Sequence, residues 1–235
     1  MDNAGVRLHA LDNGRMEAGL PPVLVIPGMG EFAEEYAWLL EALGPRRVVV
    51  LDVRGRGKSD VPATGYTWEH HVSDVEAAVR ELRLDRPITV AFSRGTSYAL
   101  GYALEHPDDI RALVVGDYYA RHVGFPAEFA DRQLQSKVRG TLIAARMSEH
   151  AVRQVFAEGR EVPLWDRLVE LRCPVMLIRG GRASAVVGEE VAATWLAALP
   201  SLRVEMIEGA GHDLWSREPD AYLAVLVPFL ADIDP

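Results

Sequence analysis

Residues 90–97 read Val-Ala-Phe-Ser-Arg-Gly-Thr-Ser, with an apolar run before them and a helix-like run after them. This order predicts that Ser93 lies where a β-strand turns sharply into a helix, with Gly95 two positions further on. The pattern is that of a nucleophile elbow, G-x-S-x-G, in which Ala91 replaces the first glycine. Such a turn exposes the serine hydroxyl and directs backbone N–H groups toward the atom that it attacks, so it predicts a nucleophilic serine.

Short apolar runs alternate with longer amphipathic runs along the chain. The predicted strands are Val6–Leu11, Val23–Ile26, Val48–Leu51, Ile88–Phe92, Ile110–Val115, Val175–Ile178 and Leu202–Ile207. The predicted helices are Glu34–Leu43, Thr67–Leu84, Gly95–Glu105, Glu189–Ala198 and Ala221–Leu230. Because strands separated by helices need crossover connections, we expect an α/β protein with a mostly parallel, doubly wound sheet and helices on both faces. In such sheets the ligand lies at the carboxyl ends of the strands.

The length of 235 residues predicts one domain, residues 1–235. Asp12-Asn13-Gly14, at the end of the first strand, is a hairpin signal. Residues 118–171 hold several amphipathic helical runs and no convincing strand. We expect this insertion to form a compact helical cap over the strand ends.

The formal net charge of −9 bears on the partners of the protein. Nucleic acids require a basic face, so neither a nucleic acid nor an anionic membrane is an expected partner, and a small molecule is. The sequence shows no signal peptide and no run long enough to span a bilayer, which predicts a cytoplasmic protein. Only Lys58 and Lys137 are lysines among 25 basic residues, a bias typical of a GC-rich bacterial genome. The oligomeric state is left open, with a homodimer among the options.

Three glycine-containing segments accompany the elbow. They are Ile26-Pro27-Gly28-Met29-Gly30, the Asp52–Ser59 segment Asp-Val-Arg-Gly-Arg-Gly-Lys-Ser, and Gly209-Ala210-Gly211-His212-Asp213. In this order, and on these predicted elements, the four segments resemble the α/β-hydrolase fold family over nearly the whole chain. The resemblance implies a serine hydrolase that needs no cofactor and no metal, with Ser93 as nucleophile. It also implies that His212 acts first as general base and then as general acid.

The carboxylate that pairs with His212 is the one catalytic residue whose position departs from the usual family pattern. Most of the family carries it after the strand predicted at Val175–Ile178, but residues 180–187 read Gly-Gly-Arg-Ala-Ser-Ala-Val-Val, with Ser184 in its position. Asp117, at the end of the preceding strand, is the best substitute, and this placement resembles that of some haloalkane dehalogenases. The alternatives are that Asp117 only orders its loop, or that another carboxylate serves: Glu189, Glu190 or Asp213.

The backbone N–H groups of Met29 and Arg94 are expected to form the oxyanion hole. The Arg94 side chain either points away and pairs with a carboxylate or contacts an anionic substrate. Asp52 and Arg54 are interpreted as residues that hold their loop. The predicted pocket residues, beside Met29, are Phe32, Tyr118, Tyr119, Val186 and Trp215, and they suggest an apolar or aromatic substrate.

The resulting hypothesis is a cofactor-independent serine hydrolase that cleaves a small carboxylic ester or lactone through an acyl-enzyme. Thioesters, amides and carbon–carbon bonds beside a ketone remain open, because the same residues serve them. Two alternatives from other classes remain. One is a lyase or cyclase of a biosynthetic pathway that uses Ser93 and His212 as acid and base, and the other is a ligand-binding protein on the same scaffold.

Overall fold

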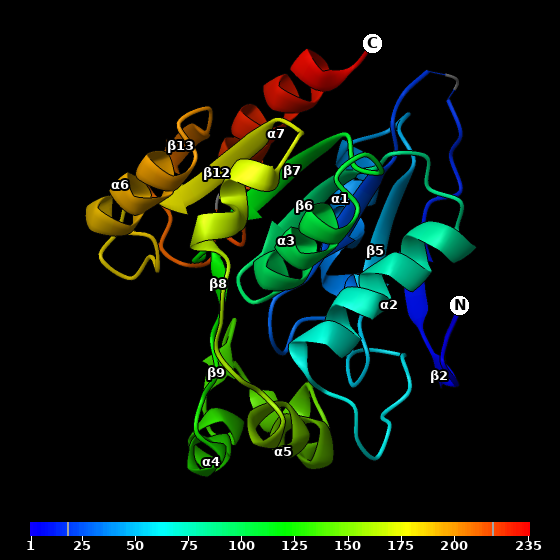
Figure 1. Ribbon diagram of the computed structural model, residues 1–235, viewed down its shortest axis with the longest axis vertical. Helices are drawn as coiled ribbons and strands as arrows, with labels where there is room; N and C mark the ends of the chain where they lie inside the picture. Colours follow the sequence, from blue (N-terminus) through cyan, green and yellow to red (C-terminus); the bar gives the residue numbers. More distant parts are fainter. Residues whose placement is uncertain (18, 218) are drawn as a thin grey trace.

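A seven-stranded sheet runs through the centre of the computed structural model, which describes residues 1–17, 19–217 and 219–235 (Figure 1). From edge to edge its strands are β13 (Arg203–Ile207), β12 (Val175–Gly180), β7 (Ala112–Gly116), β6 (Ile88–Phe92), β4 (Val23–Ile26), β5 (Val48–Asp52) and β3 (His9–Asp12). All neighbouring pairs are parallel except β3 with β5, which is antiparallel. The predicted fold class is confirmed.

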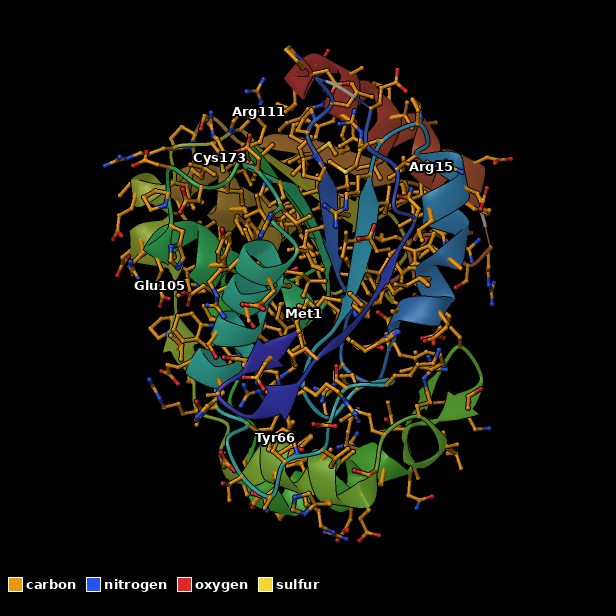
Figure 2. The ribbon with its side chains drawn as sticks, turned by 90° about the vertical axis from the view of Figure 1, so that its right-hand side faces the viewer. Met1, Arg15, Tyr66, Glu105, Arg111 and Cys173 are labelled. Atoms are coloured by element: carbon orange, nitrogen blue, oxygen red, sulfur yellow. The ribbon has the colours of Figure 1, made fainter. Side chains whose placement is uncertain are left out.

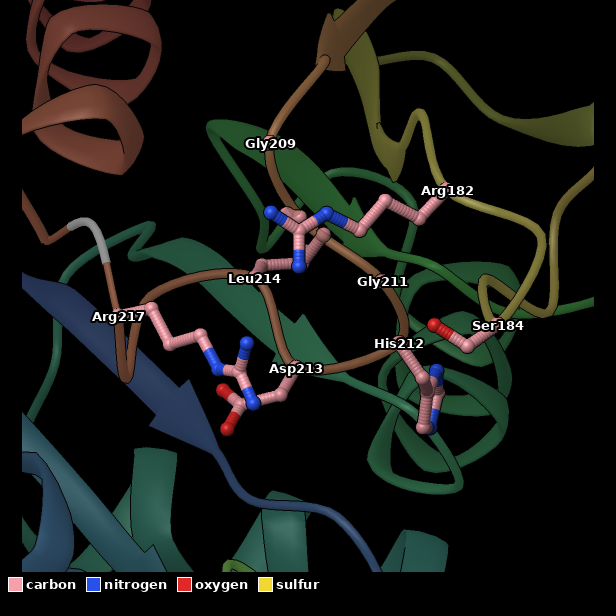
Figure 3. A pocket seen from close by; sticks show the side chains of 9 residues that line it. Arg182, Ser184, Gly209, Gly211, His212, Asp213, Leu214 and Arg217 are labelled. Carbon is pink, nitrogen blue, oxygen red and sulfur yellow. The ribbon is translucent and has the colours of Figure 1, made fainter.

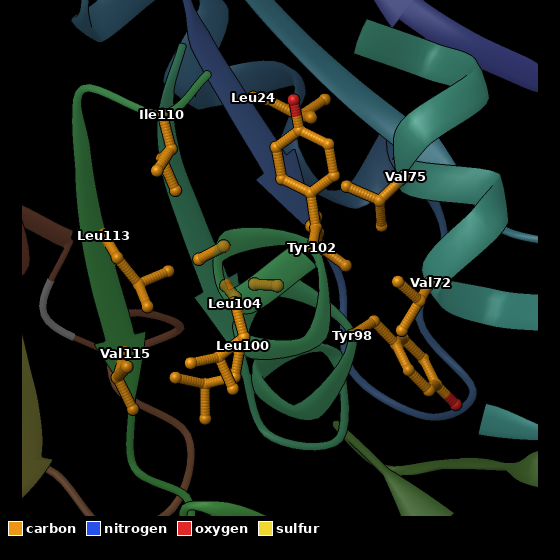
Figure 4. Packing of buried hydrophobic residues seen from close by; sticks show 14 of the residues in the cluster. Leu24, Val72, Val75, Tyr98, Leu100, Tyr102, Leu104, Ile110, Leu113 and Val115 are labelled. Carbon is orange, nitrogen blue, oxygen red and sulfur yellow. The ribbon is translucent and has the colours of Figure 1, made fainter. Parts of the chain in front are cut away.

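Helices cover both faces of this sheet. One face carries α2 (Trp68–Glu81), α3 (Gly95–Glu105) and α6 (Glu189–Ala198), and the other carries α1 (Ala37–Ala42) and α7 (Pro219–Ile233). Leu24 of β4 packs in the first layer, shown in Figure 4, whereas its neighbour Val23 packs in the second. Successive side chains of a strand point to opposite faces, so a strand buried on both faces is apolar at every position. This explains the unbroken apolar runs.

The N-terminal residues depart from the predicted hairpin at Asp12-Asn13-Gly14. The hairpin lies earlier, where β1 (Asp2–Asn3) pairs with β2 (Val6–Arg7) across Ala4-Gly5, both of which have positive φ. Asn13 instead binds the sheet, because its side-chain oxygen accepts hydrogen bonds from the backbone N–H groups of Val48 and Arg15. The helix predicted at Glu34–Leu43 is a 3-10 turn, η1 (Ala33–Tyr36), followed by α1.

Residues 118–171 contain the expected helices and also short strands that were not predicted. The helical elements are η2 (Ala127–Phe129), α4 (Ala130–Leu134), η3 (Ile143–Ala145), α5 (Glu149–Ala157) and η4 (Trp165–Glu170). The strands form two antiparallel pairs, β8 (Arg121–His122) with β11 (Val162–Pro163) and β9 (Lys137–Val138) with β10 (Thr141–Leu142). Strands of two residues are too short to show alternation. The division into one domain with a cap insertion stays a prediction.

α4, α5 and the β9–β10 hairpin, which we call the cap, lie together below the sheet in Figure 1. They enclose a small apolar core of their own: Ala130, Leu134, Ile143, Met147, Ala151, Val152, Val155 and Phe156, with Tyr66 from the chain before α2. No helix in the described parts of the chain combines the length and the apolarity needed to cross a membrane.

Candidate active site

Ser93 lies between β6 and α3 with a φ of 49°, a left-handed conformation that is strained for a residue with a side chain. The helix after it approaches β4 closely, because a Cβ atom on Gly95 would lie 2.5 Å from the carbonyl oxygens of Ile26 and Pro27. The Ser93 backbone N–H donates to the carbonyl of Gly116, at the end of β7, over 2.9 Å. The elbow is therefore fixed from both sides, with Ser93 at the carboxyl ends of the strands.

A continuous hydrogen-bonded chain joins Ser93, His212 and Asp117. His212 Nε2 lies 2.9 Å from Ser93 Oγ, and His212 Nδ1 lies 2.8 Å from Asp117 Oδ2. A carboxylate can only accept, so Nδ1 carries the imidazole proton and the Nε2 lone pair faces the serine hydroxyl. The imidazole also stacks on Phe92, with ring centroids 4.9 Å apart. This is the geometry in which a histidine takes a proton from serine.

Asp117 is fully buried and is held by three elements. Its N–H donates to Ile178 O of β12 over 2.8 Å. Its carboxylate accepts from the N–H groups of Val186 (2.8 Å) and Val187 (3.0 Å) as well as from His212. These three donors fix the orientation of the Asp117 carboxylate behind His212.

The other candidate carboxylates point elsewhere. Glu189 pairs with Arg179, Asp213 accepts from the N–H of Ser216 over 3.2 Å, and Glu190 is exposed in the first turn of α6. Ser184 is exposed and lines a neighbouring pocket behind His212 (Figure 3). The structure thus brings Asp117, and none of the alternatives considered from the sequence, to His212 Nδ1.

The N–H groups of Met29 and Arg94 suit an oxyanion hole. Within the described parts of the chain neither donates to a protein acceptor. The loop before Met29 passes close to the nucleophile, because a Cβ atom on Gly28 would lie 3.1 Å from Ser93 Cβ. Both amides are therefore available beside the serine.

A cavity of about 240 Å³ opens onto Ser93 and His212. Its lining residues are Gly28, Met29, Glu31, Phe92, Ser93, Lys137, Val138, Arg139, His212 and Asp213. The cap therefore contributes one wall, through the β9–β10 hairpin, and the loop after β4 contributes another.

Comparisons with known proteins show the family to which the chain belongs. Residues 21–144 match the family model described as alpha/beta hydrolase fold. The chain belongs to the α/β-hydrolase fold family. Two curated relatives cover nearly all of this α/β-hydrolase. One, from Bacillus subtilis, is provisionally named a 2-succinyl-6-hydroxy-2,4-cyclohexadiene-1-carboxylate synthase (23% identical, 97% of this chain, 96% of the relative). The other is the N-formylmaleamate deformylase of Pseudomonas putida (24% identical, 96% of this chain, 93% of the relative).

Solved structures show the same fold. An esterase from Exiguobacterium antarcticum superposes with a TM-score of 0.81, at 21% identity, over 97% of this hydrolase and 96% of the esterase. The likeness covers the sheet, the helices and the cap region together.

The five predicted pocket side chains lie outside the lining of the cavity beside Ser93, so a pocket role for them stays a prediction. Trp215 packs behind Phe92, with centroids 4.5 Å apart. Arg146 lies over the ring of Phe32, and Arg121 lies over the ring of Tyr119. Tyr118 is buried, and its carbonyl accepts from Trp195, while Val186 uses its backbone to hold Asp117.

Glu31 is a cavity residue that no sequence motif indicates. Its Oε2 accepts from the N–H of Gly28 (2.7 Å) and from the hydroxyl of Tyr36 (2.5 Å), and its Oε1 lies 2.7 Å from Arg139 of the cap. Burial raises the pKa of this carboxyl above its ordinary value, against the opposing effect of Arg139. Glu31 thus ties the loop of the candidate oxyanion hole to the cap.

Proposed function

We propose that this α/β-hydrolase is a cytoplasmic serine hydrolase that cleaves a small carboxylic ester or lactone through an acyl-enzyme. The observation that carries the proposal is the path from Ser93 Oγ through His212 to Asp117, with separations of 2.9 and 2.8 Å. The two N–H groups beside Ser93 that donate to no acceptor in the described residues support the same chemistry. The named esterase among the structural neighbours is consistent with it.

In the proposed reaction Ser93 Oγ bonds to the carbonyl carbon while His212 Nε2 takes the hydroxyl proton. The carbonyl electron pair moves onto oxygen, which accepts from the N–H groups of Met29 and Arg94. When the C–O bond to the alcohol breaks, the alcohol leaves with the proton held by His212. Water, deprotonated by His212, then attacks the acyl-enzyme, and the acid departs as Ser93 regains its proton.

Asp117 acts in this scheme through His212. Its carboxylate keeps the Nδ1 tautomer and stabilises the imidazolium that forms after proton transfer. The bonds and protons of this scheme balance without a redox or group-transfer cofactor.

The decisive experiment is Ser93→Ala, measured on short aryl esters. We expect kcat to fall by about 10³- to 10⁶-fold, because a triad loses most of its rate when the nucleophile is removed. A fluorophosphonate probe should label the wild type at Ser93 and leave the variant unlabelled. The matched control is Ser201→Ala, an exposed serine, which should behave as the wild type. Retained activity in Ser93→Ala would refute the assignment.

A non-hydrolytic reaction is the second candidate, because one relative carries the name of a synthase. The two are distinguished by the same probe. Labelling of Ser93 without turnover of any ester, lactone, thioester or amide would favour the non-hydrolytic reaction.

A further inference from the structure

Two arginines beside the candidate active site are buried without a carboxylate partner. Arg56 and Arg94 are each 3% exposed, and neither forms an ion pair with a carboxylate of the described residues. Arg54 is equally buried but is paired with a carboxylate, because its guanidinium binds both oxygens of Asp74 over 2.7 to 3.1 Å. A buried charge is normally paired with an opposite charge, because the transfer of an unpaired charge from water into the protein is strongly unfavourable.

Arg94 is oriented by neutral groups only. Its Nη2 donates to Nε2 of His122 (2.8 Å), its Nη1 to the carbonyl of Val123 (3.0 Å) and its Nε to the hydroxyl of Tyr98 (3.2 Å). Burial lowers the pKa of His122 to about 2, so this imidazole is neutral and adds no counter-charge. One N–H on each terminal nitrogen of Arg94 remains for another acceptor.

Arg56 has still fewer partners. Its one hydrogen bond joins Nη1 to the carbonyl of Arg54 over 3.3 Å, while Nε and Nη2 are buried and have no partner among the described residues. The nearby carboxylates are already engaged. Asp74 binds Arg54, and Glu158 accepts from the N–H groups of Gly65 and Tyr66.

Tyr98 lies beside Arg94, and both side chains are near enough to Arg56 to influence its pKa. The Tyr98 hydroxyl accepts from Arg94, and its ring stacks on His71 with centroids 4.5 Å apart. His71 in turn lies 6.2 Å from the ring of Tyr66, which Figure 2 places at the junction between the sheet and the cap. The Tyr66 hydroxyl and His71 Nε2 are also buried without partners among the described residues.

The position of this cluster relates it to the reaction. Arg94 directly follows Ser93, and Arg56 lies in the loop after β5, at the same carboxyl edge of the sheet. α5 of the cap covers the loop, because a Cβ atom on Gly55 would lie 3.0 Å from Cβ of Ala151. Arg56 and Arg94 therefore lie where the cap meets the carboxyl edge of the sheet.

We propose that Arg56 and Arg94 bind a carboxylate of the substrate, with the Tyr66 hydroxyl as an additional donor. The inference rests on the proposed function and narrows it: the ester or lactone is one whose acyl part carries a second, free carboxylate. Guanidinium groups suit this role because their paired N–H groups match the two oxygens of a carboxylate. His71 Nε2, whose ring donates from Nδ1 to the Thr67 carbonyl, is an acceptor, and it suits a hydroxyl or amide N–H elsewhere on the same substrate.

The test compares two esters of the same shape, monomethyl succinate and methyl 4-methylpentanoate, in which an isopropyl group replaces the carboxylate. The wild type should prefer the anionic ester in kcat/KM by about 10- to 100-fold, the range for hydrogen bonds to a charged group. Arg56→Gln should remove most of this preference. Arg172→Gln, an exposed arginine remote from the site, is the matched control and should keep it. Equal kcat/KM values in the wild type, or an unchanged preference in Arg56→Gln, would overturn the subsite while leaving the hydrolase.

A second measurement does not depend on turnover. In ligand-free protein Arg56→Met should raise the melting temperature by about 2–4 °C, because it removes an unpaired buried charge, whereas a structural arginine would lower it when replaced. Succinate should raise the melting temperature of the wild type and of Ser93→Ala but leave that of Arg56→Met unchanged. Stabilisation by succinate of a protein that the fluorophosphonate probe does not label at Ser93 would uphold the subsite and refute the hydrolase. A lowered melting temperature in Arg56→Met would refute the subsite.

Discussion

Asp117 supplies, from the end of β7, the carboxylate that the loop after β12 lacks. It has a φ of 45°, close to the 49° of Ser93, so two neighbouring strands end in the same strained conformation. Because β6 and β7 are paired directly, the proposed nucleophile and acid are held by one ladder of hydrogen bonds. His212 then spans the distance between them from its own loop.

The contribution of Asp117 can be measured by comparing Asp117→Asn with Ser184→Ala. An amide at 117 loses the charge that stabilises the imidazolium and allows the wrong tautomer, so kcat should fall by about 10³- to 10⁴-fold. Ser184→Ala should stay near the wild-type rate, since this side chain does not contact His212 Nδ1. A large loss in Ser184→Ala alone would contradict the placement of the acid. Circular dichroism of both variants controls for folding.

At the level of single residues, the sequence predicted the three residues of the hydrogen-bonded chain. It did not predict most of the residues that line the cavity around them. Ser93 and His212 follow from glycine-rich turns, and Asp117 follows from the absence of a carboxylate in residues 180–187. Trp215, three residues after His212, was expected to line the pocket. Its direction depends on packing against Phe92, which no local pattern encodes. Glu31 was missed for the same reason.

Arg139, in the turn of the β9–β10 hairpin, connects the cap to the loops around the site. The turn is Arg139-Gly140, both with positive φ, as in the tight turns that suit paired strands. From this turn Arg139 reaches Glu31 at 2.7 Å and Glu35 and Asp213 at 3.5 Å, and it lies over the ring of Trp215. A single residue therefore contacts the loop of Gly28, the loop of His212 and the rim of the cavity.

Arg139→Gln tests this connection. With its ion pairs removed, the hairpin should hold the cavity wall less firmly, and kcat/KM for a neutral ester should fall by about 10-fold or more, the cost of losing hydrogen bonds to a charged group. The matched control is Arg153→Gln on α5, whose pairs with Glu149 and Asp131 are exposed and should matter little. Equal kinetics in the two variants would show that the hairpin tip does not position the site.

Among the elements, long periodic segments were predictable and short paired ones were not. Gly95–Glu105 and Glu189–Ala198 have the predicted bounds, because their ends are marked by glycine, by a following proline or by acidic first turns. β8 to β11 hold two residues each and depend on partners far away in the sequence, such as His122 with Val162. The hairpin signal at Asp12-Asn13-Gly14 was overruled because the Asn13 side chain accepts from the N–H of Val48, at the start of β5.

The molecule as a whole keeps two buried histidines neutral between the sheet and the cap. Burial, reinforced by Arg56 for His71 and by Arg94 for His122, lowers the pKa of both far below the ordinary value, to about 2 for His122. The unfolded chain binds protons on them near pH 6.5, while the folded protein does not. The unfolded state therefore gains protons as the pH falls, and stability must decrease below about pH 6.5.

Urea unfolding between pH 7.5 and 5.0 measures this effect. Each histidine should reduce the free energy of unfolding by up to about 1.4 kcal/mol per pH unit below 6.5. His122→Gln, which keeps a donor and an acceptor but does not titrate, should show a shallower decline than the wild type. His106→Gln, a partly exposed histidine, serves as control. Parallel curves for the wild type and His122→Gln would contradict the neutral, buried state of this ring.

The location of the acid also has a practical consequence for protein engineering. In a hydrolase whose acid follows β12, the loop there carries a catalytic side chain, whereas here residues 182–185 carry no proposed catalytic group. The contacts that the loop makes to the His212 loop and to Asp117 come from the backbone N–H groups of Arg182, Val186 and Val187. This exposed stretch lies beside the His212 loop and is therefore a natural graft point. A reporter peptide or a recognition tag placed in it would sit at the edge of the reaction centre while leaving the nucleophile, base and acid on the chain untouched.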